Sequence, residues 1–488
     1  MMKFKLPQKY AWSGLVGLYF LTRIVNLGKL PIFNDEAIYL DWGRVMTTSG
    51  QLFFSLFDGK QPFLMWVFGL MMKVFPAWPL VAGRLVSVAS GVFSLVGLML
   101  LAKDYFSKKT AIVAGLIYIL SPIFLFFDRQ ALMEGSLMAV GIWSFYLLMK
   151  LEANRRGWIL GLLVGVWSLG LWVKSSAGIF MVSSLLMVGL LKTNRKGELF
   201  AAIVFGLFLS LILLLPLLIQ PGFANVITLN SRFALGGNEL AKMPIDIWIK
   251  NARMTLDTLA TQVAGWGLLL WFTKSKNSSK LMQLDWWLAI SLAIFVLTTR
   301  NPNPRYLVVF LPLICIGLAQ RWWEVKRWLK ILMGLSWVWL VMLDTALIFE
   351  PLAYFRTLAK VSNYSQIGAY TGGFSSGYGV KEAIDYVIRD VGDKKAIVVT
   401  RLDAGNPENA VSLYLSRYPN IQVQRWGVRP KEATDRPKYL DLEEPIYFIA
   451  REENLAGHNQ FFELVKRFDK PDGVNWVGVY KVKNLRDF

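Results

Sequence analysis

The chain has 488 residues, of which 55% are hydrophobic, and its mean hydropathy is +0.43. This composition is typical of membrane proteins and excludes a single soluble core. One cysteine, Cys315, and one histidine, His458, exclude a disulfide framework, a Cys/His zinc site and most Ser-His-Asp arrangements. Any catalysis must therefore use carboxylates, lysine, arginine, tyrosine or a hard metal ion.

The net charge of +20 is unevenly distributed along the chain. Residues 1–369 hold 35 Lys and Arg against 16 Asp and Glu, a surplus of +19, whereas residues 370–488 hold 18 against 17. In the first part the basic residues lie at the ends of apolar stretches, where they set membrane topology. This pattern argues against nucleic-acid binding as the reason for the surplus.

About eleven apolar stretches approach the roughly 20 residues that span a bilayer. They predict membrane helices at about 11–28, 80–102, 110–127, 132–149, 158–173, 176–191, 199–219, 256–273, 284–299, 305–320 and 331–349. Alternate connections are strongly basic, so the positive-inside rule places them and the N-terminus in the cytoplasm and the C-terminus outside the cell membrane. The apolar stretch from Pro62 to Phe75 is too short to span, and we expect it at the outer surface or partway in.

Residues 370–488 are charged and polar throughout and hold no spanning stretch. Gly379–Val391 and Pro407–Tyr418 have the pattern of amphipathic helices. Short strands are expected at 396–400, 421–424, 446–450 and 477–482. We therefore predict an α-helical polytopic membrane domain over 1–369 and a small extracytoplasmic α/β domain over 370–488, joined by a Gly/Ser-rich linker at 371–379.

Charged residues gather in the connections that are expected outside. Asp35 and Glu36 follow the first span and open a stretch of helical spacing in which Asp35 and Tyr39 share a face. Two adjacent carboxylates at the rim of an apolar bundle suit acid-base chemistry or a divalent metal ion. A solvated loop with an acidic first helical turn is the other interpretation.

Arg129 and Glu134 flank a short turn between two apolar stretches. Charges inside or at the rim of a membrane are costly and are often functional. The structural alternative is a mutual ion pair, although a spacing of five residues is poor on a helix.

Lys174 lies at the outer end of the fifth span, where it either reaches back to the interface or contacts an anionic headgroup. Arg300, Arg305 and Tyr306 surround a Pro-rich turn. The planar donor fork of arginine matches phosphate oxygens, so this turn favours a phosphate site. A topological cap of two neighbouring spans is equally compatible with the residues.

In order along the chain, these motifs resemble the GT-C glycosyltransferases, specifically protein O-mannosyltransferases and bacterial lipid A aminoarabinose transferases. Asp35–Tyr39 resembles the acidic motif of their first external loop. Asp58–Trp66, which contains Lys60, resembles their Lys-Pro-Pro segment, with Gln61 where the first Pro is common. Arg129–Glu134 is similar to an Arg-x4-Asp motif, with Glu in place of the usual Asp. Lys174 and Arg305–Pro312 have counterparts in position and pattern.

The resemblance covers about residues 10–320 and implies an enzyme that transfers a sugar from a polyprenyl phosphate to an acceptor, usually with inversion. We hypothesise that Asp35 is the general base, and that Glu36 or Glu134 orients the nucleophile or steadies charge at the sugar. The groups expected to stabilise the leaving phosphate are Lys60, Lys174, Arg300 and Arg305, with Tyr306 beside them. Tyr39 and Arg129 are further site residues.

The expected partners are a polyprenyl phosphate-linked sugar, membrane lipids and an acceptor that is a glycan, a lipid or a protein. Asp35 and Glu36 could together hold a divalent metal, and no other cofactor is implied. A secondary transporter or lipid flippase is the alternative, although the chain shows no inverted halves and no paired broken helices. A non-catalytic scaffold that displays the external domain is a third interpretation.

Overall fold

The computed structural model describes residues 8–273, 277–401, 403–426, 444–451 and 462–482. The chain folds as two compact units. Unit 1 contains Met1–Leu27, Gln51–Trp66 and Arg84–Tyr364. Unit 2 contains Gly28–Gly50, Val67–Gly83 and Ser365–Phe488. The domain boundary expected between residues 369 and 370 stays a prediction.

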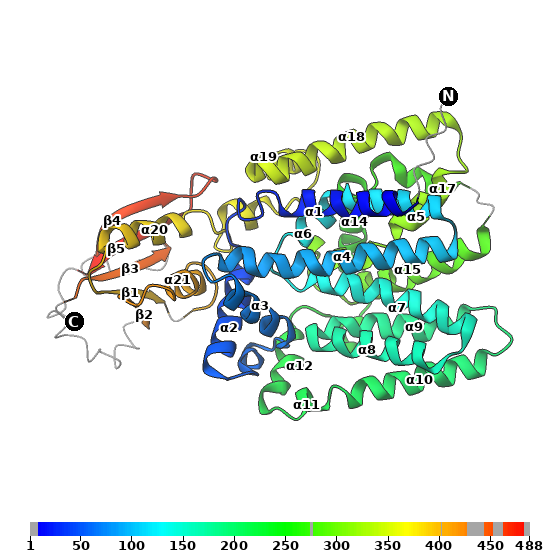
Figure 1. Cartoon of the computed structure of the whole chain (residues 1–488), viewed down its shortest axis with the longest axis horizontal. Helices are drawn as coiled ribbons and strands as arrows, with labels where there is room; N and C mark the ends of the chain where they lie inside the picture. The colour runs from blue at the N-terminus through cyan, green and yellow to red at the C-terminus, as the bar shows by residue number, and fades with distance from the viewer. Residues whose placement is uncertain (1–7, 274–276, 402, 427–443, 452–461, 483–488) are drawn as a thin grey trace. The chain divides into compact units, whose positions relative to one another are not determined.

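Unit 1 is built from helices (Figure 1). Those that begin before residue 200 are α1 (Gln8–Ile24), η1 (Phe54–Asp58), α4 (Pro79–Tyr105, which starts in unit 2), α5 (Lys108–Ile119), α6 (Pro122–Asp128), α7 (Glu134–Asn154), α8 (Gly157–Val173), η2 (Ser175–Ala177), α9 (Gly178–Leu190) and α10 (Lys196–Ile212). The later ones are α11 (Leu215–Leu218), η3 (Pro221–Phe223), α12 (Ala224–Asn230), α13 (Gly237–Leu240), α14 (Ile245–Gln262), η4 (Gly265–Phe272), α15 (Ser278–Thr298), α16 (Pro304–Leu307), η5 (Val308–Phe310), α17 (Ile314–Trp322), α18 (Arg327–Phe349) and α19 (Pro351–Ala359). Neighbours pack in pairs, with α7 on α8, α8 on α10 and α9 on α15.

Four described helices are long and apolar enough to cross a membrane, namely α4, α7, α15 and α18. Two bent pairs pass the same test together: α5 with α6 at 69°, and α16–η5 with α17 at 59°. The break before α6 falls at Pro122, which cannot continue the hydrogen-bonding pattern of α5. The other five expected spans fall on the shorter segments α1, α8, η2–α9, α10–α11 and α14–η4. The count of eleven spans therefore stays a prediction.

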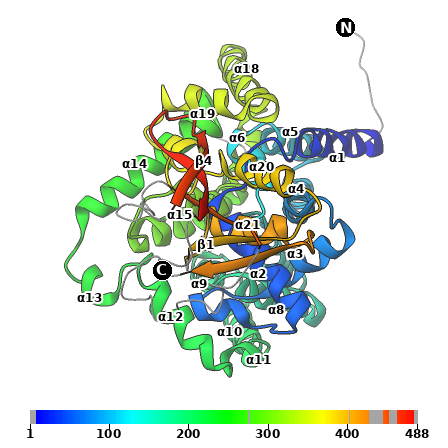
Figure 2. The same ribbon diagram turned by 90° about the vertical axis from the view of Figure 1, so that its left-hand side faces the viewer.

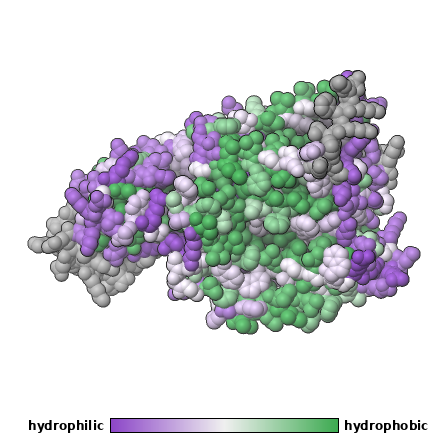
Figure 3. Space-filling model, viewed as in Figure 1, coloured by the Kyte–Doolittle hydropathy of each residue, from purple (hydrophilic) through white to green (hydrophobic). Residues whose placement is uncertain are grey.

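Hydrophobic side chains cover the face of unit 1 that Figure 3 shows. On α10, for example, Phe200, Phe205 and Phe208 are each at least half exposed. A soluble protein rarely displays so much contiguous apolar surface, whereas a helix in contact with lipid requires it.

Unit 2 contains a five-stranded mixed sheet in the order β2-β1-β3-β5-β4. The strands are β1 (Ala396–Arg401), β2 (Ile421–Trp426), β3 (Ile446–Arg451), β4 (Phe462–Asp469) and β5 (Trp476–Val482). β1 pairs in parallel with β2 and β3, whereas β5 pairs antiparallel with β3 and β4. The remaining elements are α2 (Asn34–Ser49), α3 (Phe63–Val74, which starts in unit 1), η6 (Gly368–Gly372), α20 (Val380–Val391) and α21 (Glu408–Leu415).

Helices α20 and α21 pack against the sheet, as Figures 1 and 2 show. The inward stripe of α20 is Val380, Ala383, Ile384, Val387 and Val391, which are all buried. This spacing places one apolar stripe on one side of a helix, so it explains why α20 forms. α2 in turn packs against α21. The small C-terminal α/β fold is confirmed, including four of its five strands.

One expectation for this region was wrong, and one strand was not expected. The Gly/Ser-rich segment 371–379 is not a free linker, because Ser375, Ser376 and Gly377 are buried. A Cβ at Gly377 would lie 2.0 Å from the carbonyl oxygen of Ile32, so glycine permits a close backbone contact here. β4 was missed because a bulge between Leu464 and Lys466 interrupts its alternation.

Candidate functional site

Glu134, Lys174 and Arg305 lie together in unit 1. Glu134 is the first residue of α7, Lys174 directly follows α8, and Arg305 belongs to α16. Lys174 Nζ is 3.1 Å and Arg305 Nε is 3.0 Å from the same oxygen, Glu134 Oε1. The side chains of Glu134 and Arg305 are 0% and 8% exposed, whereas that of Lys174 is 27% exposed. Two cations thus share one carboxylate in a largely buried place, which leaves a positive surplus suited to an anion.

The second carboxylate oxygen of Glu134, Oε2, is buried and has no hydrogen-bond partner among the described residues. A buried acceptor without a donor costs on the order of 1–3 kcal/mol. A hydroxyl group of a bound molecule that donates to Oε2 would remove this cost.

Two aromatic rings extend this arrangement to Lys60. Lys174 Nζ lies 5.0 Å from the ring centre of Tyr306. The ring of Tyr306 meets Phe233 edge-on at 6.1 Å, and Lys60 Nζ lies 5.4 Å from the centre of Phe233. Both cation-ring distances are within the range of cation–π attraction. We call Lys60, Glu134, Lys174, Phe233, Arg305 and Tyr306 the Glu134 cluster.

Local sequence signals explain how two of these side chains are presented. Pro304 occupies the first turn of α16, and the Asn303 side chain accepts a hydrogen bond of 2.9 Å from Arg305 N. Gly59 precedes Lys60 with a φ of +69°. A Cβ at Gly59 would lie 2.6 Å from Asn225 O, so the turn that presents Lys60 requires glycine.

Arg300 stabilises the loop that carries Phe233. Its guanidinium pairs with Glu239 at 2.5 and 2.7 Å, and its backbone N donates to Phe233 O at 3.0 Å. The hydrogen bond from Arg300 lowers the pKa of Glu239, so this pair is ionised at neutral pH. Arg300 is therefore a positioning residue for Phe233, and its expected contact with phosphate stays a prediction.

Arg129 completes the C-terminal end of α1. Its Nη1 donates to the carbonyl oxygens of Thr22, Arg23 and Val25 at 2.8 to 2.9 Å, and its Nη2 donates to Asn26 O at 2.9 Å. The last carbonyls of a helix have no partners within the helix, so the arginine supplies them. Arg129 does not form the suggested pair with Glu134, because each residue has other partners. A direct part of Arg129 in the chemistry stays a prediction.

Replacement of Arg129 by Ala is expected to lower the free energy of unfolding by on the order of 3 kcal/mol, since several buried carbonyls lose their donor. The thermal denaturation midpoint in detergent measures this loss. Arg232→Ala is the matched control, because Arg232 is exposed. An unchanged midpoint in Arg129→Ala would contradict the capping role, and lost transfer at normal stability would make Arg129 a site residue.

The acidic residues of the first external connection belong to unit 2. Glu36 is fully buried, and its Oε2 accepts a hydrogen bond of 3.0 Å from Phe33 N, which caps α2. Asp35 lies in the same first turn and is partly exposed, whereas Tyr39 is buried. The cap accounts structurally for Glu36. A single pocket that contains Asp35 and Arg305 stays a prediction.

A metal site is not evident from the geometry. Among the described residues, no three His, Cys, Asp or Glu side chains lie close enough together to hold a metal ion. Glu36 uses one oxygen for the helix cap. A divalent cation at Asp35 and Glu36 therefore stays a prediction.

The sequence did not reveal the contribution of the loop after the seventh expected span. Asn225 donates to the carbonyl oxygens of Leu56 and Phe57, and Asn230 donates to that of Gly59. This loop also supplies Phe233 to the Glu134 cluster. The only local signal was an aromatic residue between asparagines and glycines in a connection expected outside.

Comparisons with known proteins identify the fold of this chain. Residues 59–219 match the family model described as dolichyl-phosphate-mannose-protein mannosyltransferase. The structure is similar to that of ArnT from Cupriavidus metallidurans bound to undecaprenyl phosphate, with a TM-score of 0.63 and 15% identity over 97% of this chain and 98% of that one. This chain has the GT-C glycosyltransferase fold. The fold and the apolar helices make it a multi-pass membrane protein.

A second solved structure has the same fold. The oligosaccharyltransferase of Archaeoglobus fulgidus, in complex with Zn and sulfate, matches with a TM-score of 0.53 and 12% identity over 98% of this chain and 73% of that one. None of the curated protein sequences matches this chain. The resemblance to GT-C enzymes that the motifs indicated is confirmed.

Proposed function

We propose that this protein is a membrane glycosyltransferase that moves a sugar from a polyprenyl phosphate to an acceptor on the external face of the membrane. The observation that carries the proposal is the Glu134 cluster, where Lys174 and Arg305 share one buried carboxylate. The ArnT structure with this fold holds undecaprenyl phosphate. The excess of positive charge in the cluster suits the phosphate of such a donor.

In the proposed reaction an oxygen of the acceptor attacks the anomeric carbon of the sugar, and the bond from that carbon to the phosphate oxygen breaks. Asp35 takes the proton of the acceptor. The polyprenyl phosphate leaves with an additional negative charge, which Lys174 and Arg305 stabilise. Glu134 holds both cations in place, and its Oε2 accepts a hydrogen bond from a sugar hydroxyl.

The proposal also fixes an orientation at the plasma membrane. The basic connections face the cytoplasm, so the N-terminal end of α1 is cytoplasmic and the C-terminal strands lie outside. Nucleotide sugars are generally confined to the cytoplasm. A lipid-borne donor is therefore the suitable source of the sugar on the external face.

The decisive experiment is sugar transfer in vesicles that contain the purified protein, a radiolabelled polyprenyl phosphate sugar and a mixture of envelope acceptors. We expect the label to move to an acceptor and free polyprenyl phosphate to accumulate. A flippase would move the lipid across the membrane without consuming it, and a scaffold would do neither. An intact donor after incubation with competent acceptors would contradict the proposal.

Arg305→Gln is expected to weaken binding of polyprenyl phosphate about tenfold, equivalent to about 1.4 kcal/mol, because the arginine is a charged donor to the phosphate. Arg321→Gln is the matched control, since Arg321 is also a buried arginine, paired with Asp285 at 2.6 Å. Affinity is measured by titration of polyprenyl phosphate into protein in nanodiscs. Equal affinities of wild type and Arg305→Gln would exclude the phosphate role.

The proposal assigns no step to a metal ion. Transfer should therefore continue when EDTA is added to the vesicle assay and should not rise when Mg²⁺ or Mn²⁺ is restored. The matched control is the same assay without chelator. Loss of transfer in EDTA, followed by recovery with one of these cations, would instead support a divalent metal at Asp35 and Glu36.

A further inference from the structure

A polar pocket lies within unit 2, and none of the residues that line it belongs to the Glu134 cluster. It has a volume of about 350 Å³ and is lined by α2, the end of α21, the turn that follows α21, and β2. Two arginines, Arg44 and Arg425, line it together with Ser416, Tyr418 and an apolar wall that includes Leu415. Its volume is near the lower end of the range for small-molecule sites.

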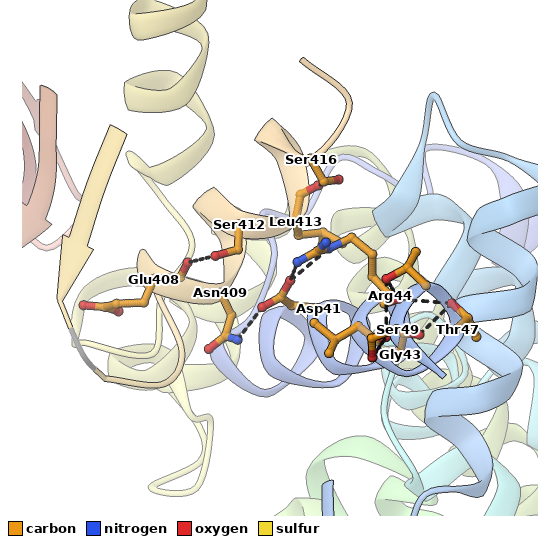
Figure 4. A network of polar contacts seen from close by, with 12 residues as sticks. Asp41, Gly43, Arg44, Thr47, Ser49, Glu408, Asn409, Ser412, Leu413 and Ser416 are labelled. Atoms are coloured by element: carbon orange, nitrogen blue, oxygen red, sulfur yellow. Dashed lines mark hydrogen bonds and ion pairs between the residues drawn. The ribbon is translucent and has the colours of Figure 1, made fainter. Parts of the chain in front are cut away.

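The two arginines share a single carboxylate. Asp41 Oδ1 accepts hydrogen bonds of 3.1 and 2.7 Å from Arg44, and Asp41 Oδ2 lies 3.3 Å from Arg425 Nη2. Asp41 Oδ2 also accepts a hydrogen bond of 2.8 Å from Asn409 Nδ2 on α21. Figure 4 shows Asp41 between Arg44 and the α21 residues Asn409 and Ser412. Each carboxylate oxygen of Asp41 therefore has two donors and no further capacity to accept hydrogen bonds.

The two guanidinium groups have more unoccupied hydrogen-bonding positions than the carboxylate of Asp41. Their side chains are 30% and 31% exposed, whereas that of Asp41 is 4% exposed. Each guanidinium has five N–H donors. Among the described residues, Arg44 makes two side-chain hydrogen bonds and Arg425 makes three, of which the two from Nη2 are 3.3 and 3.5 Å long. Donors therefore remain for a ligand.

A purely structural role explains only part of this arrangement. The Asp41–Asn409 hydrogen bond already joins α2 to α21, and one arginine would neutralise the carboxylate. The second guanidinium gives the group formed with Asp41 and Arg44 a net charge of +1, which suits a bound anion. Both groups lie at an open pocket, where an anion can reach them.

We propose that this pocket binds the oxyanion group of a small acidic sugar, either a phosphate or a carboxylate. Arg44 and Arg425 hold the oxyanion, because the arginine fork matches two oxygens of such a group. Pro419 and Val423, which line the pocket and are exposed and partly exposed, contact the apolar C–H face of the sugar ring. The site lies outside the proposed transfer chemistry, and its occupancy does not depend on a donor.

Titration calorimetry on the full chain in detergent, without any donor lipid, tests the proposal. The probes are glucose 6-phosphate, glucuronate, inorganic phosphate and neutral glucose. We expect glucose 6-phosphate or glucuronate to bind at least tenfold more tightly than glucose, and to bind more weakly at high salt. The tighter of the two identifies the oxyanion. Equal binding of glucose and both acidic sugars, or no binding of either acidic sugar, would overturn the proposal.

Variants separate the pocket from general charge effects. Arg425→Gln should weaken acidic-sugar binding at least tenfold, whereas the matched control Arg467→Gln, on the exposed face of β4, should leave it unchanged. Ser416→Trp fills the pocket from its exposed rim and should abolish binding at an unchanged denaturation midpoint. Normal binding in both Arg425→Gln and Ser416→Trp would overturn the proposal. Sugar transfer in the vesicle assay is a separate readout, so failure of either idea leaves the other measurable.

Discussion

Asp35→Asn is expected to lower the rate of sugar transfer by about 10² to 10⁴-fold, because a positioned general base contributes about that much to a rate. The amide has nearly the same shape as the carboxylate but cannot take a proton from the acceptor. The initial rate of label transfer in vesicles measures the effect. A rate within a few-fold of the wild type would remove Asp35 from the proposed mechanism.

The fold should survive this substitution. The start of α2 is held by its neighbours in unit 2, since Asn34 Oδ1 accepts a hydrogen bond of 2.8 Å from Asn406 N. Asn406 Nδ2 in turn donates to Ile32 O at 3.0 Å. Asp35 is partly exposed, and asparagine keeps the size and shape of its side chain. The denaturation midpoint of Asp35→Asn should therefore equal that of the wild type.

Asp246→Asn is the matched control for this experiment. Asp246 also lies in the first turn of a helix, α14, and is exposed. Its substitution should change neither transfer nor stability. A similar loss of transfer in both variants would show that the effect arises from helix ends or surface charge and not from a base.

The regular elements of this chain were predictable because their signals are local. The apolar stretches at 80–102 and 132–149 coincide with α4 and α7, since their length alone indicates a membrane helix. In the C-terminal region the periodic apolar positions of α20 predicted its start and end within one residue. β4 has no such alternation, because it is bulged and pairs with β5 alone among the described strands.

The partners of the charged residues were not predictable in the same way. Lys174 and Arg305 reach Glu134 from positions that are 40 and 171 residues away along the chain. Nothing in the sequence around Glu134 distinguishes these partners from Arg129, which is much nearer. Arg129 donates hydrogen bonds to carbonyl oxygens at the end of α1. The sequence around residue 129 does not indicate that a distant helix end needs these donors.

The same limit applies to the residues of unit 2. Asp41, Arg44 and Arg425 come from a connection near the N-terminus and a strand near the C-terminus. Asp41 and Arg44 are three residues apart on α2, which is the ordinary spacing of a surface ion pair. Arg425 lies on β2 at the edge of the sheet, where a charged residue is common. Only the packing of α2 on α21 shows that Arg44 and Arg425 line one pocket and that both pair with Asp41.

Glu134→Gln is expected to lower the free energy of unfolding by about 3 kcal/mol and the rate of transfer at least tenfold. The substitution keeps the shape of the side chain but removes the charge that Lys174 and Arg305 share. Two like charges then remain close together in a place where Arg305 is 8% exposed. Removal of one partner from a buried ion pair costs about 3–5 kcal/mol of stability. We expect a value near the lower limit, because Lys174 is 27% exposed and solvent partly screens its charge.

The donor should partly reverse this destabilisation. In Glu134→Gln the phosphate of polyprenyl phosphate becomes the anion nearest to the two cations, so it should raise the denaturation midpoint of the variant more than that of the wild type. This sign separates a residue that holds two phosphate-binding cations from one that only supports the fold. Equal shifts in the variant and the wild type would contradict the proposed role of the cluster.

Asp285→Asn is the matched control, because Asp285 pairs with the buried Arg321 at 2.6 Å. Asp285 lies near the start of α15, whereas the turn that carries Arg305 follows the end of this helix. At 1.5 Å per residue the two places are roughly 20 Å apart along the helix axis. The control should lose stability as Glu134→Gln does, yet respond to polyprenyl phosphate as the wild type does. If polyprenyl phosphate raised the denaturation midpoint of both variants more than that of the wild type, the lipid would stabilise any weakened variant. That result would contradict phosphate binding by the Glu134 cluster.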